Sequence, residues 1–201
     1  RSCLVSWARR CVSETGINIC PFDAYKMDAE AIVADAKEAV KALISACEGY
    51  KTEYTNEIEN AKKEWDAIVD EYYSTELPGG LNQTLALGII NEFMGEDDIA
   101  VGSAGSLPGD MQRLFRPKNR GTYHMEYGYS NMGYEINGAL GVKLAQPDKE
   151  VYTFCGDGSF LMAHSELYTS LQEGLKLNIC IFDNVGWGCI ENLQNNQGTD
   201  T

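Results

Sequence analysis

Two short polar motifs, each placed directly after an apolar run, most constrain how this 201-residue chain folds. Val151–Cys155 is predicted to be a buried strand, and Gly-Asp-Gly follows it at positions 156–158. Leu177–Phe182 is predicted to be a second strand, and Asp-Asn-Val-Gly follows it at positions 183–186. A helix is expected between them, over Ser165–Gln172. Continuous apolar strands that alternate with helices are typical of a parallel sheet. The sequence therefore predicts an α/β fold, a parallel sheet with helices on both faces.

The same alternation extends upstream of these motifs. A helix is predicted at about Leu81–Met94, a strand at Asp98–Val101 and, after a loop rich in Tyr and Gly, another helix at about Met132–Leu144. Residues 81–201 are therefore interpreted as one α/β domain. Because 17 residues follow Asn184, we expect this domain to be shortened at its C-terminal end.

Residues 28–80 are interpreted as an acidic linker of two helices. Positions 28–76 hold 13 Asp and Glu residues against 5 Lys residues. Apolar residues recur at helical spacing in both halves of this segment. They are Ile32, Val33, Ala36, Val40, Leu43, Ile44 and Cys47, then Ile58, Ala61, Trp65, Ile68, Val69 and Tyr72. Residues 1–27, with a strand expected to end near Ile19, are interpreted as the tail of a preceding central domain.

Charge and composition exclude several classes of function. With 30 acidic and 16 basic residues the net charge is −14, which argues against a partner that is a nucleic acid or an anionic membrane. The chain has no apolar stretch long enough to span a bilayer. Its seven cysteines form no C-x-x-C pair, so we expect free thiols and a reducing, cytoplasmic setting.

The two polar motifs predict a metal site. Carboxyl ends of neighbouring parallel strands meet at one edge of a sheet, so Asp157 and Asn184 are expected side by side. A carboxylate and an amide oxygen are ligands that suit Mg²⁺, which shares its shell with substrate phosphates. Gly156 and Gly158 let a diphosphate approach the backbone, and amides of the following helix can hold it. A Gly-Asp-Gly tripeptide alone is more often an ordinary turn; the second strand and motif are what favour the site.

The segments GDGSF and FDNVGWG resemble the diphosphate-binding motif of thiamine-diphosphate enzymes. That motif opens with GDG and closes with an Asn pair, whose first member here is Asp183. The resemblance implies thiamine diphosphate and Mg²⁺ as cofactors, with Asp157, Asn184 and the Gly186 carbonyl as metal ligands. The segment GYSNMG resembles the part that supports the bent cofactor, with Met132 between its rings and the Ser130 carbonyl accepting from the aminopyrimidine. The implied cofactor-binding residues are Ser106, Ser130, Met132, Gly133, Gly156, Asp157, Gly158, Ser159, Asn184 and Gly186.

Longer phrases, including VGSAGSLPGDMQRLFRPK and GTYHMEYGYSNMGYEINGALGVKLA, resemble a narrower family, the trihydroxycyclohexane-1,2-dione hydrolases of myo-inositol catabolism. The resemblance covers about Pro21 to Gln197. It implies hydrolytic C–C cleavage of a polyol-derived small molecule, 3D-(3,5/4)-trihydroxycyclohexane-1,2-dione, to 5-deoxy-glucuronate. It also implies a homo-oligomer, a dimer or tetramer, in which a Glu from a separate N-terminal domain activates the cofactor. The chain is then an internal fragment, inactive in isolation.

Other residues are weaker candidates. His124 and Glu191 are candidate catalytic or substrate-contacting groups, although a structural His and a solvated carboxylate are competing interpretations. Glu126 is expected to be a solvated surface acid rather than an active-site acid, and Trp187 either covers the cofactor or packs its loop. Two other functions stay open: a thiamine-diphosphate enzyme of the acetolactate-synthase or 2-oxoacid decarboxylase type, and a non-catalytic module that binds Mg²⁺ and a diphosphate.

Overall fold

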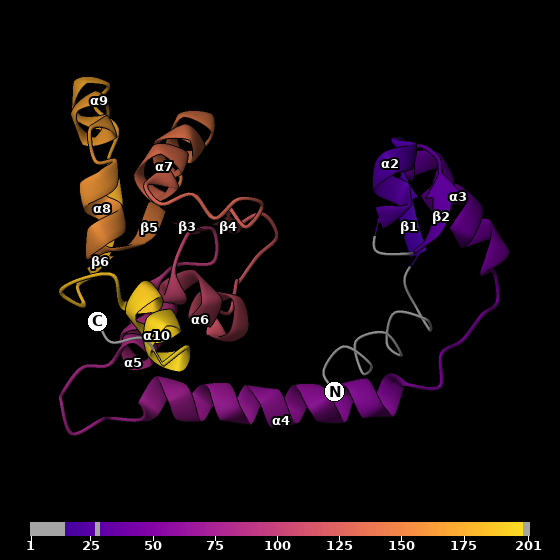
Figure 1. Cartoon of the computed structure of the whole chain (residues 1–201), viewed down its shortest axis with the longest axis horizontal. Coiled ribbons are helices and arrows are strands. Elements are labelled where there is room, and N and C mark those ends of the chain that lie inside the picture. The colour runs from indigo at the N-terminus through magenta and orange to yellow at the C-terminus, as the bar shows by residue number, and fades with distance from the viewer. Residues whose placement is uncertain (1–14, 27–28, 199–201) are drawn as a thin grey trace. The chain divides into compact units, whose positions relative to one another are not determined.

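The structure is a computed structural model that describes residues 15–26 and 29–198. The chain divides into two compact units, residues 1–59 and 60–201, which we describe separately. Figure 1 labels their helices and strands in chain order. The interpretation of residues 1–14 falls outside the described residues.

The first unit contains a small parallel β-α-β arrangement. Strand β1 (Thr15–Asn18) pairs in parallel with β2 (Glu30–Val33), and the short helix α2 (Pro21–Ala24) lies between them in sequence. Helix α3 (Ala36–Ala46) follows, and its N-cap Asp35 accepts a hydrogen bond from the Lys37 backbone N–H at 2.9 Å. The prediction that Ile32 and Val33 belong to a helix is wrong. These β-branched residues favour the extended backbone, and the helix begins only after the Asp35 cap.

Helix α4 (Thr55–Ser74) confirms the helical spacing predicted for the second half of the acidic segment. Its part in the second unit packs through a narrow apolar stripe. Val69 is 2% exposed, Trp65 Nε1 donates to the Arg113 carbonyl at 3.1 Å, and the Tyr73 hydroxyl donates to the Leu114 carbonyl at 2.6 Å. The acidic residues of this helix lie mainly on its other, exposed faces.

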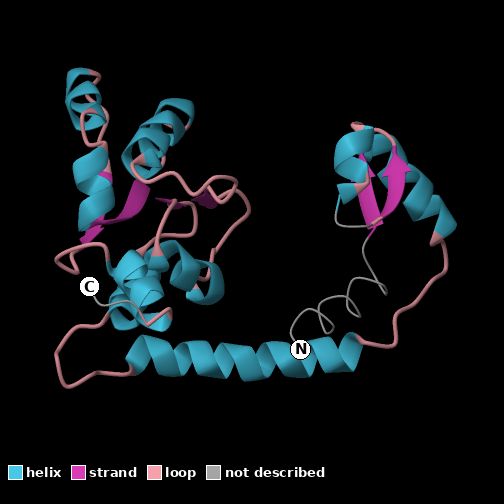
Figure 2. Cartoon of the chain, in the orientation of Figure 1, coloured by secondary structure: helices cyan, strands magenta, loops and turns pink. Residues whose placement is uncertain are grey.

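A four-stranded parallel sheet forms the centre of the second unit (Figure 2). Its order is β4-β3-β5-β6, from β3 (Ile99–Gly102), β4 (Tyr123–Met125), β5 (Val151–Gly156) and β6 (Asn178–Phe182). The helices of this unit after α4 are α5 (Gln83–Phe93), α6 (Ser106–Leu114), α7 (Tyr134–Ala145), α8 (Asp157–Met162), α9 (Glu166–Gln172) and α10 (Gly188–Asn196).

The side chains of alternate strand residues are buried on opposite faces of this sheet. On one face Ala100 and Phe154 pack with apolar residues of the α5 and α6 region, including Leu87 and Met111. On the other face the cluster consists of Ile99, Val101 and Val151 with Ala139 of α7. Helices therefore cover both faces, which confirms the predicted α/β class.

Three elements differ from the predictions. The Tyr- and Gly-rich loop contains β4, whose Tyr-His-Met sequence carries no apolar run and which pairs only through three residues with β3. The single helix expected between β5 and β6 is two helices, because α8 begins directly at Asp157, where an acid in the first turn complements the helix dipole. No helix was predicted over the residues that form α10.

No helix in the described part of the chain is both long and apolar enough to cross a membrane.

Candidate functional site

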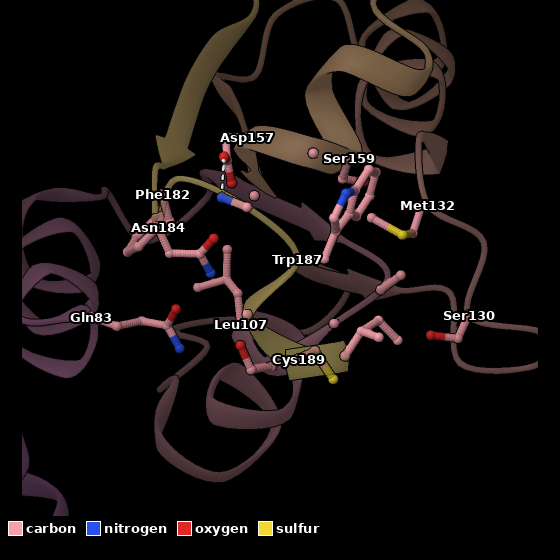
Figure 3. A pocket seen from close by; sticks show the side chains of 18 residues that line it. Gln83, Leu107, Ser130, Met132, Asp157, Ser159, Phe182, Asn184, Trp187 and Cys189 are labelled. Atoms are coloured by element: carbon pink, nitrogen blue, oxygen red, sulfur yellow. Dashed lines mark hydrogen bonds between the residues drawn. The ribbon is translucent and has the colours of Figure 1, made fainter. Parts of the chain in front are cut away.

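The two polar motifs meet at the carboxyl edge of the sheet. Strands β5 and β6 are parallel neighbours, and Gly156 at the end of one pairs with Phe182 at the end of the other. The residues that follow them, Asp157 and Asn184, therefore lie at the same edge (Figure 3). Buried residues behind this edge, such as Phe154 at 0% exposure, fix where the strands end.

A tight turn after β6 brings Gly186 to the same place. The Asp183 carboxylate accepts a hydrogen bond from the Val185 N–H at 2.8 Å, and Val185 adopts a left-handed backbone with φ of 60°. Such a conformation is rare for a β-branched residue and costs about 1–3 kcal/mol. The Gly186 N–H then donates to Asp157 Oδ2 at 3.0 Å. Asp183, which departs from the expected Asn, thus supplies the acceptor that holds this turn.

Three oxygen-bearing groups converge at this edge. One terminal atom of the Asn184 amide lies 3.2 Å from Asp157 Oδ1 and 2.8 Å from the Gly186 carbonyl oxygen. With the amide nitrogen in that place, it donates hydrogen bonds to both oxygens. With the amide turned by 180°, its oxygen takes the place and three acceptors face one another, an arrangement that a cation relieves. In one orientation the amide therefore donates hydrogen bonds to the other two groups, and in the other orientation it presents its oxygen to a metal ion.

This set of donors suits Mg²⁺. A carboxylate, an amide oxygen and a backbone carbonyl are hard oxygen ligands, and Mg²⁺ commonly uses few protein ligands beside phosphate oxygens. The described residues contain no cluster of three His, Cys, Asp or Glu side chains able to hold a metal. The mixed oxygen set at the ends of β5 and β6 is therefore the candidate metal site.

A cavity of about 240 Å³ lies beside these oxygens, and Figure 3 shows the side chains that line it. Every predicted cofactor-binding residue except Gly133 lines it. Gly133 lies behind the wall, where its N–H donates to the Ser159 hydroxyl at 2.9 Å. The lining residues are Gln83, Ala104, Gly105, Ser106, Leu107, Ser130, Met132, Gly156, Asp157, Gly158, Ser159, Phe182, Asn184, Gly186, Trp187, Gly188, Cys189 and Ile190.

The cavity offers backbone amides to an anion rather than cationic side chains. No Lys or Arg is among the described residues that line it. Helices α6 and α10 both begin at its wall, and neither has a side-chain cap on its first-turn amides. Uncapped amides at helix starts are suited to bind a phosphate group.

The loop before α7 forms another wall of the cavity. Glu126 accepts hydrogen bonds from the backbone N–H groups of Asn131 at 2.8 Å and Tyr129 at 2.9 Å. These backbone hydrogen bonds, that of Asn131 first, lower the pKa of the Glu126 carboxyl. They enclose Ser130, which has a left-handed backbone with φ of 54°. Glu126 does not line the cavity, and beyond the expected surface position its carboxylate organises this loop.

Met132 follows the loop and lines the cavity. It precedes α7 rather than beginning it, is half-buried, and belongs to neither buried core cluster of the sheet. Its position at the cavity wall favours the ligand-contacting interpretation over that of an ordinary core methionine.

Trp187 lies directly against the Gly-Asp-Gly turn. A Cβ on Gly158 would be 2.7 Å from Cζ3 of the Trp187 ring, so only glycine permits this approach. Trp187 is 51% exposed and lines the cavity. The ring therefore both packs the loop and borders the space that a cofactor would take.

The two weaker candidates are not part of the cavity wall. His124 is exposed on β4, where its Nε2 is 3.1 Å from the Gly121 carbonyl oxygen. Glu191 is exposed in the first turn of α10. Neither lines the cavity.

Sequence reasoning missed several residues of the wall. Gln83 enters from the first turn of α5 and donates to Asp110 Oδ2 at 2.6 Å. Cys189 and Ile190 enter from α10, for which no helix was predicted. Leu107 enters from α6. The missed residues carry no motif, and only the fold brings them to the edge of the sheet.

Residues 103–201 match the family model described as "Thiamine pyrophosphate enzyme, C-terminal TPP binding domain". The match contains every residue that lines the cavity except Gln83. This part of the chain therefore belongs to the C-terminal TPP-binding domain of thiamine pyrophosphate enzymes, whose cofactor is thiamine diphosphate.

The similarity extends to particular enzymes. The chain is 50% identical over 205 residues to the 3D-(3,5/4)-trihydroxycyclohexane-1,2-dione hydrolase of Geobacillus thermodenitrificans. It is 46% identical over 209 residues to that of Clostridium tetani and 47% identical over 208 residues to that of Bacillus thuringiensis. Each comparison covers 90% of this chain and 32% of the relative. The chain thus spans about a third of the length of these relatives, and the resemblance found in the sequence is confirmed.

Proposed function

We propose that this chain is the cofactor-anchoring part of an enzyme that uses thiamine diphosphate and Mg²⁺ to hydrolyse a C–C bond of 3D-(3,5/4)-trihydroxycyclohexane-1,2-dione. The observation that carries the proposal is the convergence of the Asp157 carboxylate, the Asn184 amide and the Gly186 carbonyl beside a cavity whose described lining residues include no Lys or Arg. The identity of about half to relatives with that name supports the substrate. The product is then 5-deoxy-glucuronate, and the reaction belongs to myo-inositol catabolism.

The residues of the cavity divide the work of binding. Asp157, Asn184 and the Gly186 carbonyl hold Mg²⁺, and uncapped amides of α6 and α10 hold the diphosphate. Ser130 and Met132 support the organic rings. The bound cofactor supplies a carbon nucleophile for a carbonyl of the dione, while the protein supplies binding, orientation and electrostatics.

The activating acid belongs elsewhere in this proposal. Activation requires a carboxylic acid beside the aminopyrimidine ring. Asp157 is committed to the metal edge, and neither His124 nor Glu191 lines the cavity. We therefore assign activation to a Glu of an N-terminal domain, contributed by another subunit of a homodimer or homotetramer. The five cysteines in the described residues are free thiols, which supports a cytoplasmic enzyme; Cys3 and Cys11 lie outside those residues.

Turnover by the protein expressed from its complete reading frame tests the substrate. Incubation with the cyclic dione should give the ring-opened acid, and incubation with pyruvate should give no product. Turnover of pyruvate without turnover of the dione would instead establish an enzyme of the acetolactate-synthase or decarboxylase type. Binding of Mg²⁺ and thiamine diphosphate without turnover of either would establish a binding module.

Exchange at the reactive carbon of the thiazolium ring tests where the activating acid lies. With the 201-residue chain alone, hydrogen–deuterium exchange at this carbon should be no faster than in the free cofactor. Accelerated exchange would show that an activating acid lies within the chain and would contradict its assignment to another domain.

A further inference from the structure

One buried acid is absent from both the motif and the cavity wall. Glu135, the second residue of α7, is 1% exposed. No ion pair among the described residues involves it. Burying a carboxyl group without a counter-ion is costly unless hydrogen bonds satisfy it, so its partners indicate what it does.

Within residues 15–26 and 29–198, every hydrogen-bond partner of Glu135 is a donor. The Ser159 hydroxyl donates to Glu135 Oε1 at 2.7 Å, and the Gly133 N–H donates to Oε2 at 2.8 Å. The Ala104 N–H points to Oε1 at a longer 3.5 Å. The two oxygens of a carboxylate can accept all of these bonds. Burial, and next the charge of Glu135, raise the pKa of the neighbouring Cys155 thiol to about 12.

These donors come from the ends of three different strands. Ala104 follows β3, Gly133 closes the loop after β4, and Ser159 follows β5. Ala104 and Ser159 line the cavity, and Gly133 directly follows the lining residue Met132. The Gly133 N–H also donates to the Ser159 hydroxyl at 2.9 Å, which closes a triangle of bonds among Glu135, Ser159 and Gly133.

We infer that Glu135 is a positioning residue that ties the ring-supporting segment 130–133 to the diphosphate motif 156–159. It fixes the spacing between Met132 and the Asp157 turn before a cofactor binds. Binding then loses less conformational entropy, because these segments are already ordered. The inference rests on the proposed function, and it adds a residue that touches neither metal nor cofactor but sets the distance between the groups that do.

Binding of two probes to the 201-residue chain tests this role. Thiamine diphosphate with Mg²⁺ uses both segments, whereas inorganic pyrophosphate with Mg²⁺ uses only the diphosphate motif. Glu135→Gln keeps the shape but turns an amide N–H₂ toward a donor. It should raise the Kd of thiamine diphosphate about tenfold and that of pyrophosphate less than about threefold, measured by calorimetry. Equal weakening of both probes, or no weakening of either, would overturn the inference.

Glu166→Gln is the matched control. Glu166 also lies in the first turn of a helix, α9, but does not line the cavity. The substitution removes the same charge and the same dipole interaction, so it should leave both affinities unchanged. If Glu166→Gln lowers the affinity as much as Glu135→Gln does, the effect comes from net charge. That result would contradict the inference that Glu135 links segments 130–133 and 156–159.

Hydrogen exchange of the backbone keeps the test independent of the proposed function. Without any ligand, Glu135→Gln should speed exchange in segments 103–107, 130–135 and 157–160 while strand Val151–Phe154 stays protected. Ser159→Ala, which removes one donor and leaves the carboxylate, should speed exchange at 133–135 and carries the test if Glu135→Gln gives no soluble protein. Unchanged exchange would overturn the inference. Failure of the unsubstituted chain to bind either probe would contradict the proposed function instead.

Discussion

The metal side and the ring side of the cavity are built by different means. The metal side, formed by Asp157, Asn184 and Gly186, lies at the ends of two adjacent strands whose inner residues are buried. The ring side, formed by Ser130 and Met132, lies on a loop between a partly buried three-residue strand and α7. Strand pairing positions the first, whereas hydrogen bonds to two carboxylates position the second.

Because of this difference, substitutions on the two sides should act in different ways. At the metal side the core holds the backbone, so a substitution there chiefly removes a ligand. At the ring side the backbone itself depends on Glu126, whose oxygens accept from Tyr129 and Asn131, and on Glu135 through Gly133. Substituting these acids should therefore change the position of residues that are not themselves altered.

Asp157→Ala should have the largest effect, because it removes the one charged ligand of the metal site. Loss of groups that merely orient metal ligands costs 10- to 100-fold, so we expect Mg²⁺-dependent thiamine diphosphate binding to weaken by more than about 100-fold. Calorimetry with the 201-residue chain measures it. Asp148→Ala, an exposed acid after α7, is the control and should bind normally. Unchanged affinity in Asp157→Ala would exclude this metal site.

Gly158→Ala should weaken binding less, by about 3- to 10-fold. The added methyl group meets the Trp187 ring at 2.7 Å, and the half-exposed ring can move aside at moderate cost. The movement should also change the tryptophan fluorescence of the protein. Gly141→Ala, which meets no atom within 4 Å, is the matched glycine control. If Gly158→Ala leaves both affinity and fluorescence unchanged, the contact between Trp187 and the turn is not part of the site.

Glu126→Gln, a substitution on the ring side, should have the smallest effect. We expect it to lower the Tm slightly, by an amount that depends on pH. The backbone N–H groups of Asn131 and Tyr129 lower the pKa of the Glu126 carboxyl in the folded state. Its stabilisation is therefore present above the unfolded pKa of about 4.3 and is lost as the pH falls through the lower folded value. The variant should melt slightly below the wild type at pH 7, and the difference in Tm should shrink in acid. A difference that stays constant would show that the carboxylate does not hold the loop.

The sequence predicts the metal side far better than the ring side, for physical reasons. Apolar runs predict β5 and β6, and parallel pairing brings the residues that follow these strands together. Asp157 and Asn184 could therefore be placed side by side from spacing alone. Ser130 and Met132 were placed only by family resemblance, because β4 has no apolar run and Ser130 has a strained backbone. Glu135 was missed, since a single acid among helical residues reveals neither its burial nor the donors from three strands.

Crystallography with Mn²⁺ in place of Mg²⁺ tests the central claim most directly. The anomalous signal of Mn²⁺, in crystals of the chain grown with thiamine diphosphate, locates the metal without assumption about its ligands. The account predicts one peak within about 2.5 Å of Asp157 Oδ1, the Asn184 amide oxygen and the Gly186 carbonyl oxygen, with phosphate oxygens completing the shell. A peak held by other residues, or an Asn184 amide that keeps its nitrogen toward Asp157 while the diphosphate is bound, would contradict it.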